Sequence, residues 1–126
     1  MKSLFRIVLT ASLSFASAAA FLPAPSNAAV FAAWEVANVK FGDVLNVRKY
    51  PSNESQIQAG YQNGTVLQMT GRCKGGTPNL LDIAHLPEWK QEQLVRYRWC
   101  EVWHDPMQNG KYVTGWVYGR YISPAD

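Results

Sequence analysis

The chain has 126 residues with 12 Lys or Arg and 9 Asp or Glu, so its formal net charge is +3. This length corresponds to one domain and excludes two separate hydrophobic cores. Lys2 and Arg6 fall in an N-terminal leader, and the remaining 10 basic and 9 acidic residues leave a net charge of +1. Since no basic stripe is visible, we expect no nucleic-acid partner.

Residues 1–28 are predicted to be a secretory signal peptide. Lys2 and Arg6 give the positive start, residues 7–22 are apolar or small, and Ser26-Asn27-Ala28 forms a cleavage site of the Ser-x-Ala type. A membrane anchor is the alternative, but the run is shorter than the ~20 apolar residues that a span needs. We therefore expect a single exported domain at residues 29–126, with no stable membrane span after cleavage.

Short alternating runs predict an all-β domain of five or six strands. Residues 28–33 are expected to be a lead-in without regular structure. Asn63-Gly64 and Asn109-Gly110 each predict a hairpin turn between two runs. The expected strands are residues 34–39, 44–48, 57–62, 65–69, 98–104 and 111–118.

Two cysteines, Cys73 and Cys100, are predicted to form a disulfide. Export places them in an oxidising compartment, where small domains are commonly cross-linked because their cores are marginal. Two unpaired thiols or a metal pair are the alternative. No other Cys, and no His at ligand spacing, lies near either one, so we expect no metal and no cofactor.

Residues 86–95 interrupt the strand pattern and predict one short inserted helix. Pro87 suits a first helical turn, and strong helix formers follow it. Leu86, Trp89 or Lys90, and Leu94 fall near one helical face.

The segment from Gly115 to Ile122 predicts a corner that closes a small barrel. Gly115 and Gly119 bracket a Trp-Val-Tyr run, and a tight turn with positive φ, which only Gly tolerates well, is expected after it. Trp116 is expected in the core.

Three separated motifs resemble the bacterial SH3-like (SH3b) domain family over residues 34–122. They are Leu45-Asn46-Val47-Arg48 with Pro51-Ser52, then Gly60 with Gly64, and finally Gly115-Trp116-Val117 with Gly119, Tyr121 and Ile122. The resemblance implies a small SH3-like barrel and a non-catalytic module that binds peptidoglycan or a cell-envelope protein. Together with the leader it implies a periplasmic location, with secretion as the second choice.

Aromatic side chains are the main candidates for ligand binding, because five Trp and six Tyr exceed what so small a core can bury. Tyr and Trp offer large rigid faces with a polar tip, and sugar rings stack on such faces. The inserted helix could instead cover Trp99 and Trp103, and His104 is expected at the surface, where a strand ends. The candidate residues are Tyr50, Tyr61, Trp99, Trp103, His104, Tyr118 and Tyr121. Arginines that could meet carboxylates of a partner are Arg48, Arg72, Arg96, Arg98 and Arg120.

Catalysis is not expected, because a disulfide would consume both thiols and no nucleophile-elbow motif is present. Alternation also places Glu101 on the opposite face of its strand from His104. A second hypothesis is an inhibitor of a wall-cleaving glycosidase such as lysozyme. In that case His104 or an Arg on a loop would enter the acidic cleft that holds the paired carboxylates. A hydrolase with an unrecognised site is the third hypothesis.

Overall fold

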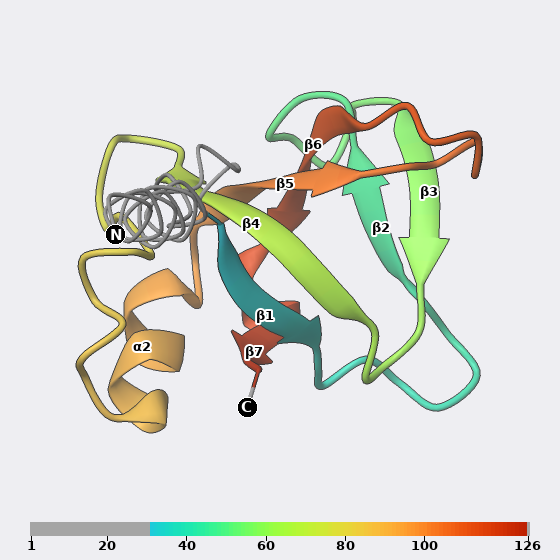
Figure 1. The fold of residues 1–126 in the computed structure, drawn as a ribbon. Helices are drawn as coiled ribbons and strands as arrows, with labels where there is room; N and C mark the ends of the chain where they lie inside the picture. Colours follow the sequence, from blue (N-terminus) through green and yellow to red (C-terminus); the bar gives the residue numbers. More distant parts are fainter. Residues whose placement is uncertain (1–30, 126) are drawn as a thin grey trace, which may run out of the picture.

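The computed structural model describes residues 31–125, which form seven strands, one α-helix and one short 3-10 helix (Figure 1). The strands are β1 (Ala32–Val36), β2 (Leu45–Arg48), β3 (Ile57–Tyr61), β4 (Val66–Cys73), β5 (Trp99–His104), β6 (Val113–Tyr118) and β7 (Ile122–Pro124). The helices are α2 (Glu88–Val95) and η1 (Gly119–Tyr121). The all-β class with one helix is confirmed, with seven strands in place of the expected five or six. The predicted signal peptide lies outside the described residues.

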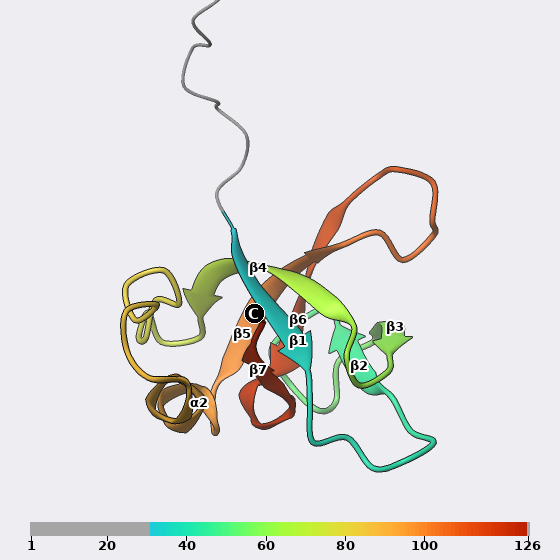
Figure 2. The same cartoon turned by 60° about the horizontal axis from the view of Figure 1, so that its bottom comes forward.

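All seven strands belong to one antiparallel sheet in the order β3-β2-β6-β5-β4-β1-β7, with β3 and β7 at its edges. The hairpin of β5 and β6 lies at its centre and runs in register from Trp99 opposite Tyr118 to His104 opposite Val113. Residues 105–112 connect these two strands and project from the sheet (Figure 2). The hairpin predicted at Asn109-Gly110 is therefore confirmed.

The hairpin predicted at Asn63-Gly64 is wrong, because β3 pairs with β2 whereas β4 pairs with β1 and β5. The turn itself is present, with Gly64 at a φ of 89°. The Asn63 side chain accepts the Val39 N–H (3.1 Å) and donates to the Val39 carbonyl (2.8 Å). Asn63 thus holds the loop at 37–44 in place. The hairpin prediction fails because an Asn-Gly pair specifies a local turn but does not specify which strand pairs with which.

Strand β1 begins two residues earlier than expected, at Ala32. Ala32 and Ala33 pair with Met69 and Gln68 of β4. The expected lead-in is therefore wrong at these two positions, because ladder hydrogen bonds use the backbone and need no alternation of side chains.

The core lies on the inward faces of the strands, where alternation is as predicted. Leu45 and Val47 are buried on β2, and Cys100 and Val102 are buried on β5. Further core residues are Trp34, Val36, Leu67, Met69, Leu80, Val95, Val117 and Ile122. Full burial of each large aliphatic side chain stabilises the fold by roughly 1.5–3 kcal/mol.

The predicted disulfide between Cys73 and Cys100 is present and joins opposite positions of β4 and β5. It closes a loop over a sequence separation of 27 residues, which in the chain-entropy model stabilises the fold by roughly 3 to 4 kcal/mol. The segment that contains α2 therefore begins and ends at a covalent link inside the core.

Helix α2 forms as predicted, with Pro87 at the N-cap, but it buries a different face. Gln91 and Val95 are buried, whereas Trp89 is 66% exposed. The Gln91 amide can be buried because it donates to the carbonyls of Leu86 (2.7 Å) and Ala84 (3.4 Å). Within residues 31–125, no helix is both long and apolar enough to cross a membrane.

Gly119 is needed for close packing and not for a positive φ, so the expectation of a positive-φ turn at this residue is wrong. Its N–H donates to the Arg98 carbonyl (2.7 Å), and a Cβ at this position would overlap the backbone carbonyl of Val95. Gly115 has a similar role, because a Cβ there would overlap the side chains of Val47 and Gln58. The two glycines let α2 approach η1 and let β2 and β3 fold over β6.

Trp116 lies half-buried on the outer face of β6, and its expected place in the core is wrong. Gly115 and Val117 occupy the inward positions of this strand, so alternation turns Trp116 outward. The Arg72 guanidinium lies 5.8 Å from its ring centroid, a distance typical of a cation–π contact.

Candidate binding site

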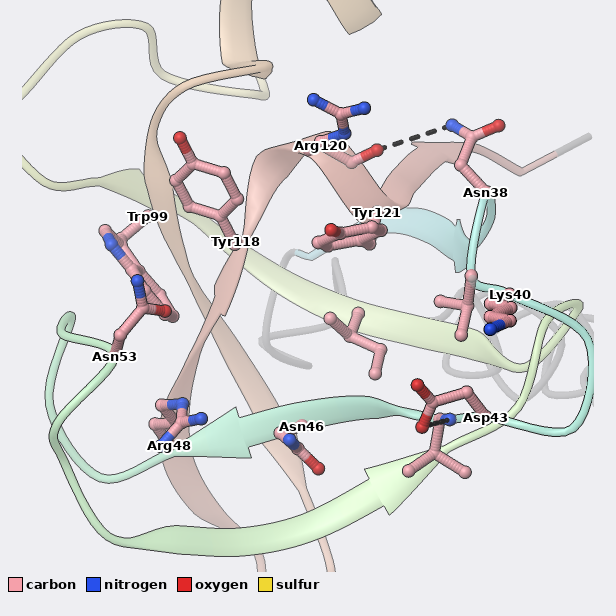
Figure 3. Close-up of a pocket in the computed structure, with 13 residues that line it drawn as sticks. Asn38, Lys40, Asp43, Asn46, Arg48, Asn53, Trp99, Tyr118, Arg120 and Tyr121 are labelled. Carbon is pink, nitrogen blue, oxygen red and sulfur yellow. Dashed lines mark hydrogen bonds between the residues drawn. The ribbon is translucent and has the colours of Figure 1, made fainter.

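A cavity of about 370 Å³ opens between β2, the Trp99 end of β5 and the segment from Tyr118 to Tyr121 (Figure 3). Its volume falls within the range of about 300–1,000 Å³ that is usual for small-ligand sites. The lining residues are Asn38, Val39, Lys40, Asp43, Val44, Leu45, Asn46, Arg48, Asn53, Trp99, Tyr118, Arg120 and Tyr121. We call this hollow the aromatic cavity.

Three half-buried rings form one wall of the aromatic cavity. Trp99 and Tyr118 are cross-strand neighbours, and their ring centroids lie 5.3 Å apart. The turn of η1 brings Tyr121 back beside Tyr118, at 6.5 Å between centroids. Because the rings pack against one another, they lose little conformational freedom when a ligand binds.

Positive charge is concentrated at the aromatic cavity, which is lined by Lys40, Arg48 and Arg120 but by only one acid, Asp43. Arg48 is held in place because its guanidinium donates to the Ser55 carbonyl (2.8 Å). Within residues 31–125 the one ion pair is Arg72–Glu101, so none of these three cations is paired with a described carboxylate. A ligand carboxylate would therefore meet unneutralised donors here.

Three amide side chains complete the polar lining of the aromatic cavity. Asn38, Asn46 and Asn53 each offer both a donor and an acceptor. Asn38 also donates to the backbone carbonyl of Arg120 (3.3 Å), as Figure 3 shows. Such groups match the hydroxyls and acetamides of a sugar.

Of the predicted site residues, the structure brings Trp99, Tyr118 and Tyr121 together in the aromatic cavity. Tyr50 lies outside it and is 60% exposed, with the Lys49 ammonium 5.6 Å from its ring. Trp103 is 38% exposed and lines a separate hollow of about 170 Å³. That hollow is also lined by Tyr61, His104, Asp105 and Tyr112.

The predicted alternative in which the helix covers Trp99 and Trp103 is not what the structure shows. Helix α2 packs on η1 and β7, and Glu92 accepts the Ser123 hydroxyl (2.6 Å). The side chain of Trp103 stays exposed, and that of Trp99 lines the aromatic cavity.

His104 is buried, so the expectation of a surface histidine is wrong. Position 104 shares the inward face of β5 with Cys100 and Val102. Its Nδ1 lies 2.9 Å from the Tyr61 hydroxyl, and its Nε2 lies 2.9 Å from Gln58 Oε1. Both ring nitrogens are therefore already hydrogen-bonded within the protein.

Burial also perturbs the titration of this pair. It lowers the pKa of His104, and the Asp105 charge opposes the effect. It raises the pKa of Tyr61, with smaller contributions in the same direction from Asp105 and Tyr112. Both groups are thus favoured in their neutral forms in the folded protein.

The asparagines and Lys40 of the aromatic cavity were not predicted from the sequence. Asn46 could have been noticed, because it lies on the outward face of the same short strand as Arg48. Asn38, Lys40 and Asn53 lie in loops, and no sequence pattern connects them with the aromatic residues.

Acidic and nucleophilic side chains are sparse in the lining of the aromatic cavity. Asp43 is the only carboxylate among the lining residues, and no lining residue is His or Cys, whereas glycoside hydrolysis ordinarily needs a pair of carboxylates. Within residues 31–125, no group of three or more His, Cys, Asp or Glu could hold a metal ion.

Comparisons with protein-family models, curated proteins and solved structures find no match for this chain.

Proposed function

We propose that the protein is an exported, non-catalytic binding module that recognises cell-wall peptidoglycan. The observation that carries this proposal is the aromatic cavity, which combines three packed rings with cations and amides. We further propose that the curved antiparallel sheet is an SH3-like barrel and that the protein acts in the periplasm, with secretion as the second choice. The SH3b-like sequence motifs at residues 34–122 support both points.

Peptidoglycan matches each part of the lining. The faces of its sugars can stack on Trp99, Tyr118 and Tyr121, as sugar faces do on large rigid rings. The carboxylates of its peptide stems can pair with Arg48 or Arg120, and guanidinium groups bind carboxylates by two parallel hydrogen bonds. The asparagine amides can bond the acetamido groups. An envelope protein with exposed carboxylates would use the same cations.

Inhibition of a wall-cleaving glycosidase such as lysozyme is a weaker alternative. It needs a cation or an imidazole on a projecting loop, but His104 is buried and both of its nitrogens are bonded. The loop at 105–112 does project (Figure 2). Its one basic side chain, Lys111, is therefore the only cation on the loop that could enter the acidic cleft, and the loop holds no Arg. The Asp105 carboxylate shapes the loop by accepting the N–H groups of Asn109 and Gly110.

The test mixes the purified protein with insoluble peptidoglycan, sediments the wall and measures the bound fraction. Trp99→Ala should lower the affinity about tenfold, because it removes one of the three rings on which a sugar face can stack; stacking of a nucleic-acid base on such a ring, taken as a guide, contributes about 1–3 kcal/mol. Trp103→Ala is the matched control, since it removes a Trp from the outer face of the same strand but outside the aromatic cavity. A lysozyme turbidity assay runs in parallel.

Loss of sedimentation in Trp99→Ala alone would support wall binding through the aromatic cavity. Equal loss in both variants would instead indicate nonspecific aromatic adsorption. Slowed lysis without sedimentation would overturn the proposal and favour the inhibitor.

A further inference from the structure

Two further hollows continue the aromatic cavity toward helix α2. The first, of about 270 Å³, is lined by Asn38, Arg96 and Arg120 and shares Asn38 and Arg120 with the cavity. The second, of about 400 Å³, is lined by Trp89, Gln93, Arg96 and Tyr97 and shares Arg96 with the first. Because each hollow shares at least one lining residue with the next, the three lie next to one another, and we call them together the binding track.

The contact between α2 and η1 brings the middle of the binding track together. Helix α2 ends at Val95, and Arg96 is its C-cap residue. Gly119 packs η1 against the Val95 carbonyl, so Arg120, the next residue, comes to line the same hollow as Arg96. Without the inserted helix this surface would end at Arg120. The helix therefore extends it to Arg96 and beyond.

Charge is concentrated along the binding track. Its lining holds four basic residues, Lys40, Arg48, Arg96 and Arg120, and one acidic residue, Asp43, so it carries +3. Residues 29–126 as a whole carry +1, from 10 basic and 9 acidic residues. The rest of the domain is therefore slightly negative, and an anion would be drawn to the track.

Aromatic side chains lie at both ends of the binding track, with cations between them. Trp99, Tyr118 and Tyr121 form one end. At the other end Trp89 is 66% exposed and Tyr97 is 71% exposed. The two rings thus form an exposed aromatic surface beside Arg96, and exposed apolar surface that is rimmed by polar groups can mark a ligand-binding groove.

We propose that the binding track holds an extended glycan strand that carries carboxylates. Sugars stack at both aromatic ends, and carboxylates between them pair with Arg120 and Arg96. The inference rests on the proposed function and adds two properties to it. The ligand must be longer than the aromatic cavity alone could hold, and it must be anionic.

The test measures dissociation constants for galacturonic acid oligosaccharides, a disaccharide and an octasaccharide, and for the fully methyl-esterified octasaccharide. The ester keeps the sugar backbone but removes the charge. The acidic octasaccharide should bind at least about tenfold more tightly than the disaccharide, because only a longer ligand can reach both ends of the binding track. It should also bind at least about tenfold more tightly than its ester, because charge-assisted hydrogen bonds are about twice as strong as neutral ones.

Arg96→Gln separates the two halves of the binding track. It should weaken binding of the acidic octasaccharide about three- to tenfold and leave disaccharide binding unchanged, because a single charge contact contributes about that much. Arg98→Gln is the matched control: it removes an exposed arginine two residues away that lines none of the three hollows. Thermal unfolding checks that both variants are folded.

The two proposals fail in different ways. In one case, sedimentation with peptidoglycan needs Trp99 but is unaffected by Arg96→Gln, and the acidic octasaccharide and its ester bind equally well. That result would overturn the proposal of an extended acidic ligand and would leave the proposed wall-binding function intact. No sedimentation at all would overturn the proposed function itself.

Discussion

The two ends of strand β5 carry similar side chains but have opposite roles. At one end Trp99 packs against Tyr118 and lines the aromatic cavity, where three cations lack a described acidic partner. At the other end His104 is enclosed by Tyr61 and Gln58, and each ring nitrogen has a partner. Aromatic content alone therefore does not identify a binding site. The distinguishing feature is whether the polar groups around the rings are already satisfied.

A glycine controls the packing at each of these ends, and substituting them should give the largest effects. Gly119→Ala should lower the free energy of unfolding by about 3–5 kcal/mol, because its Cβ would meet the backbone carbonyl of Val95, which cannot move without displacing α2. Gly115→Ala should cost less, about 1–3 kcal/mol, because the side chains of Val47 and Gln58 can shift. Urea unfolding of the two variants measures both values.

The order of these two losses is the informative result. A larger loss of stability for Gly115→Ala would mean that the end of β5 at His104 is packed more rigidly than the end at Trp99. A loss below about 1 kcal/mol for Gly119→Ala would mean that α2 moves away from η1 without cost.

The role of Gly119 also illustrates what the sequence could not predict. Its motif was apparent, but the partner that requires a glycine is the end of a helix more than twenty residues earlier in the chain. Alternation predicted the inward faces of β2 and β5 because it depends only on neighbours along the chain. The pairing of β3 could not be predicted in the same way, since it depends on where distant strands lie.

The next largest effect is expected in the pH dependence of stability, which depends on His104 and Tyr61 at the His104 end of β5. The pKa of His104 is lowered from 6.5, so below this value the unfolded chain binds a proton that the folded chain resists. Stability should be full above pH 6.5 and fall as the pH drops through the folded pKa. The pKa of Tyr61 is raised from 10.0, so stability should also fall at high pH, as the unfolded tyrosine loses its proton first.

Two variants isolate these contributions. His104→Gln should flatten the acid side of the stability profile, and Tyr61→Phe should flatten the alkaline side and cost about 1–2 kcal/mol, because it leaves His104 Nδ1 without its partner. Neither should change peptidoglycan binding, since neither residue lines the aromatic cavity. An acid slope that is the same in wild type and His104→Gln would contradict the assignment.

The aromatic cavity was predictable only in part, for a physical reason. Trp99, Tyr118 and Tyr121 were candidates because rings of this size exceed what a small core can bury. The cations and amides come from separate loops and strands, at residues 38–48, 53 and 120, and only folding brings them beside the rings. His104 is a case in which two sequence signals disagree: its position at a strand end favours the surface, whereas the alternation of β5 favours the inward face, and the structure follows the alternation.

Two arginines beside Trp116 give the smallest change in stability and the clearest contrast in function. Arg72 lies over the Trp116 ring and pairs with Glu101 (3.2 Å), with side-chain exposures of 67% and 12%. Arg48 lies opposite Trp116 in the β2–β6 pairing and lines the aromatic cavity. Arg72→Gln should cost less than about 1 kcal/mol, as expected for an exposed ion pair.

Arg48→Gln and Arg72→Gln should differ sharply in peptidoglycan sedimentation. Arg48→Gln should lower the affinity about tenfold, because it removes a charged donor that the Ser55 carbonyl holds at the aromatic cavity. Arg72→Gln should bind as wild type does, because the Glu101 carboxylate already neutralises its charge and it lines no part of the cavity. Equal losses in the two variants would mean that the wall responds to the overall positive charge of the sheet and not to the aromatic cavity.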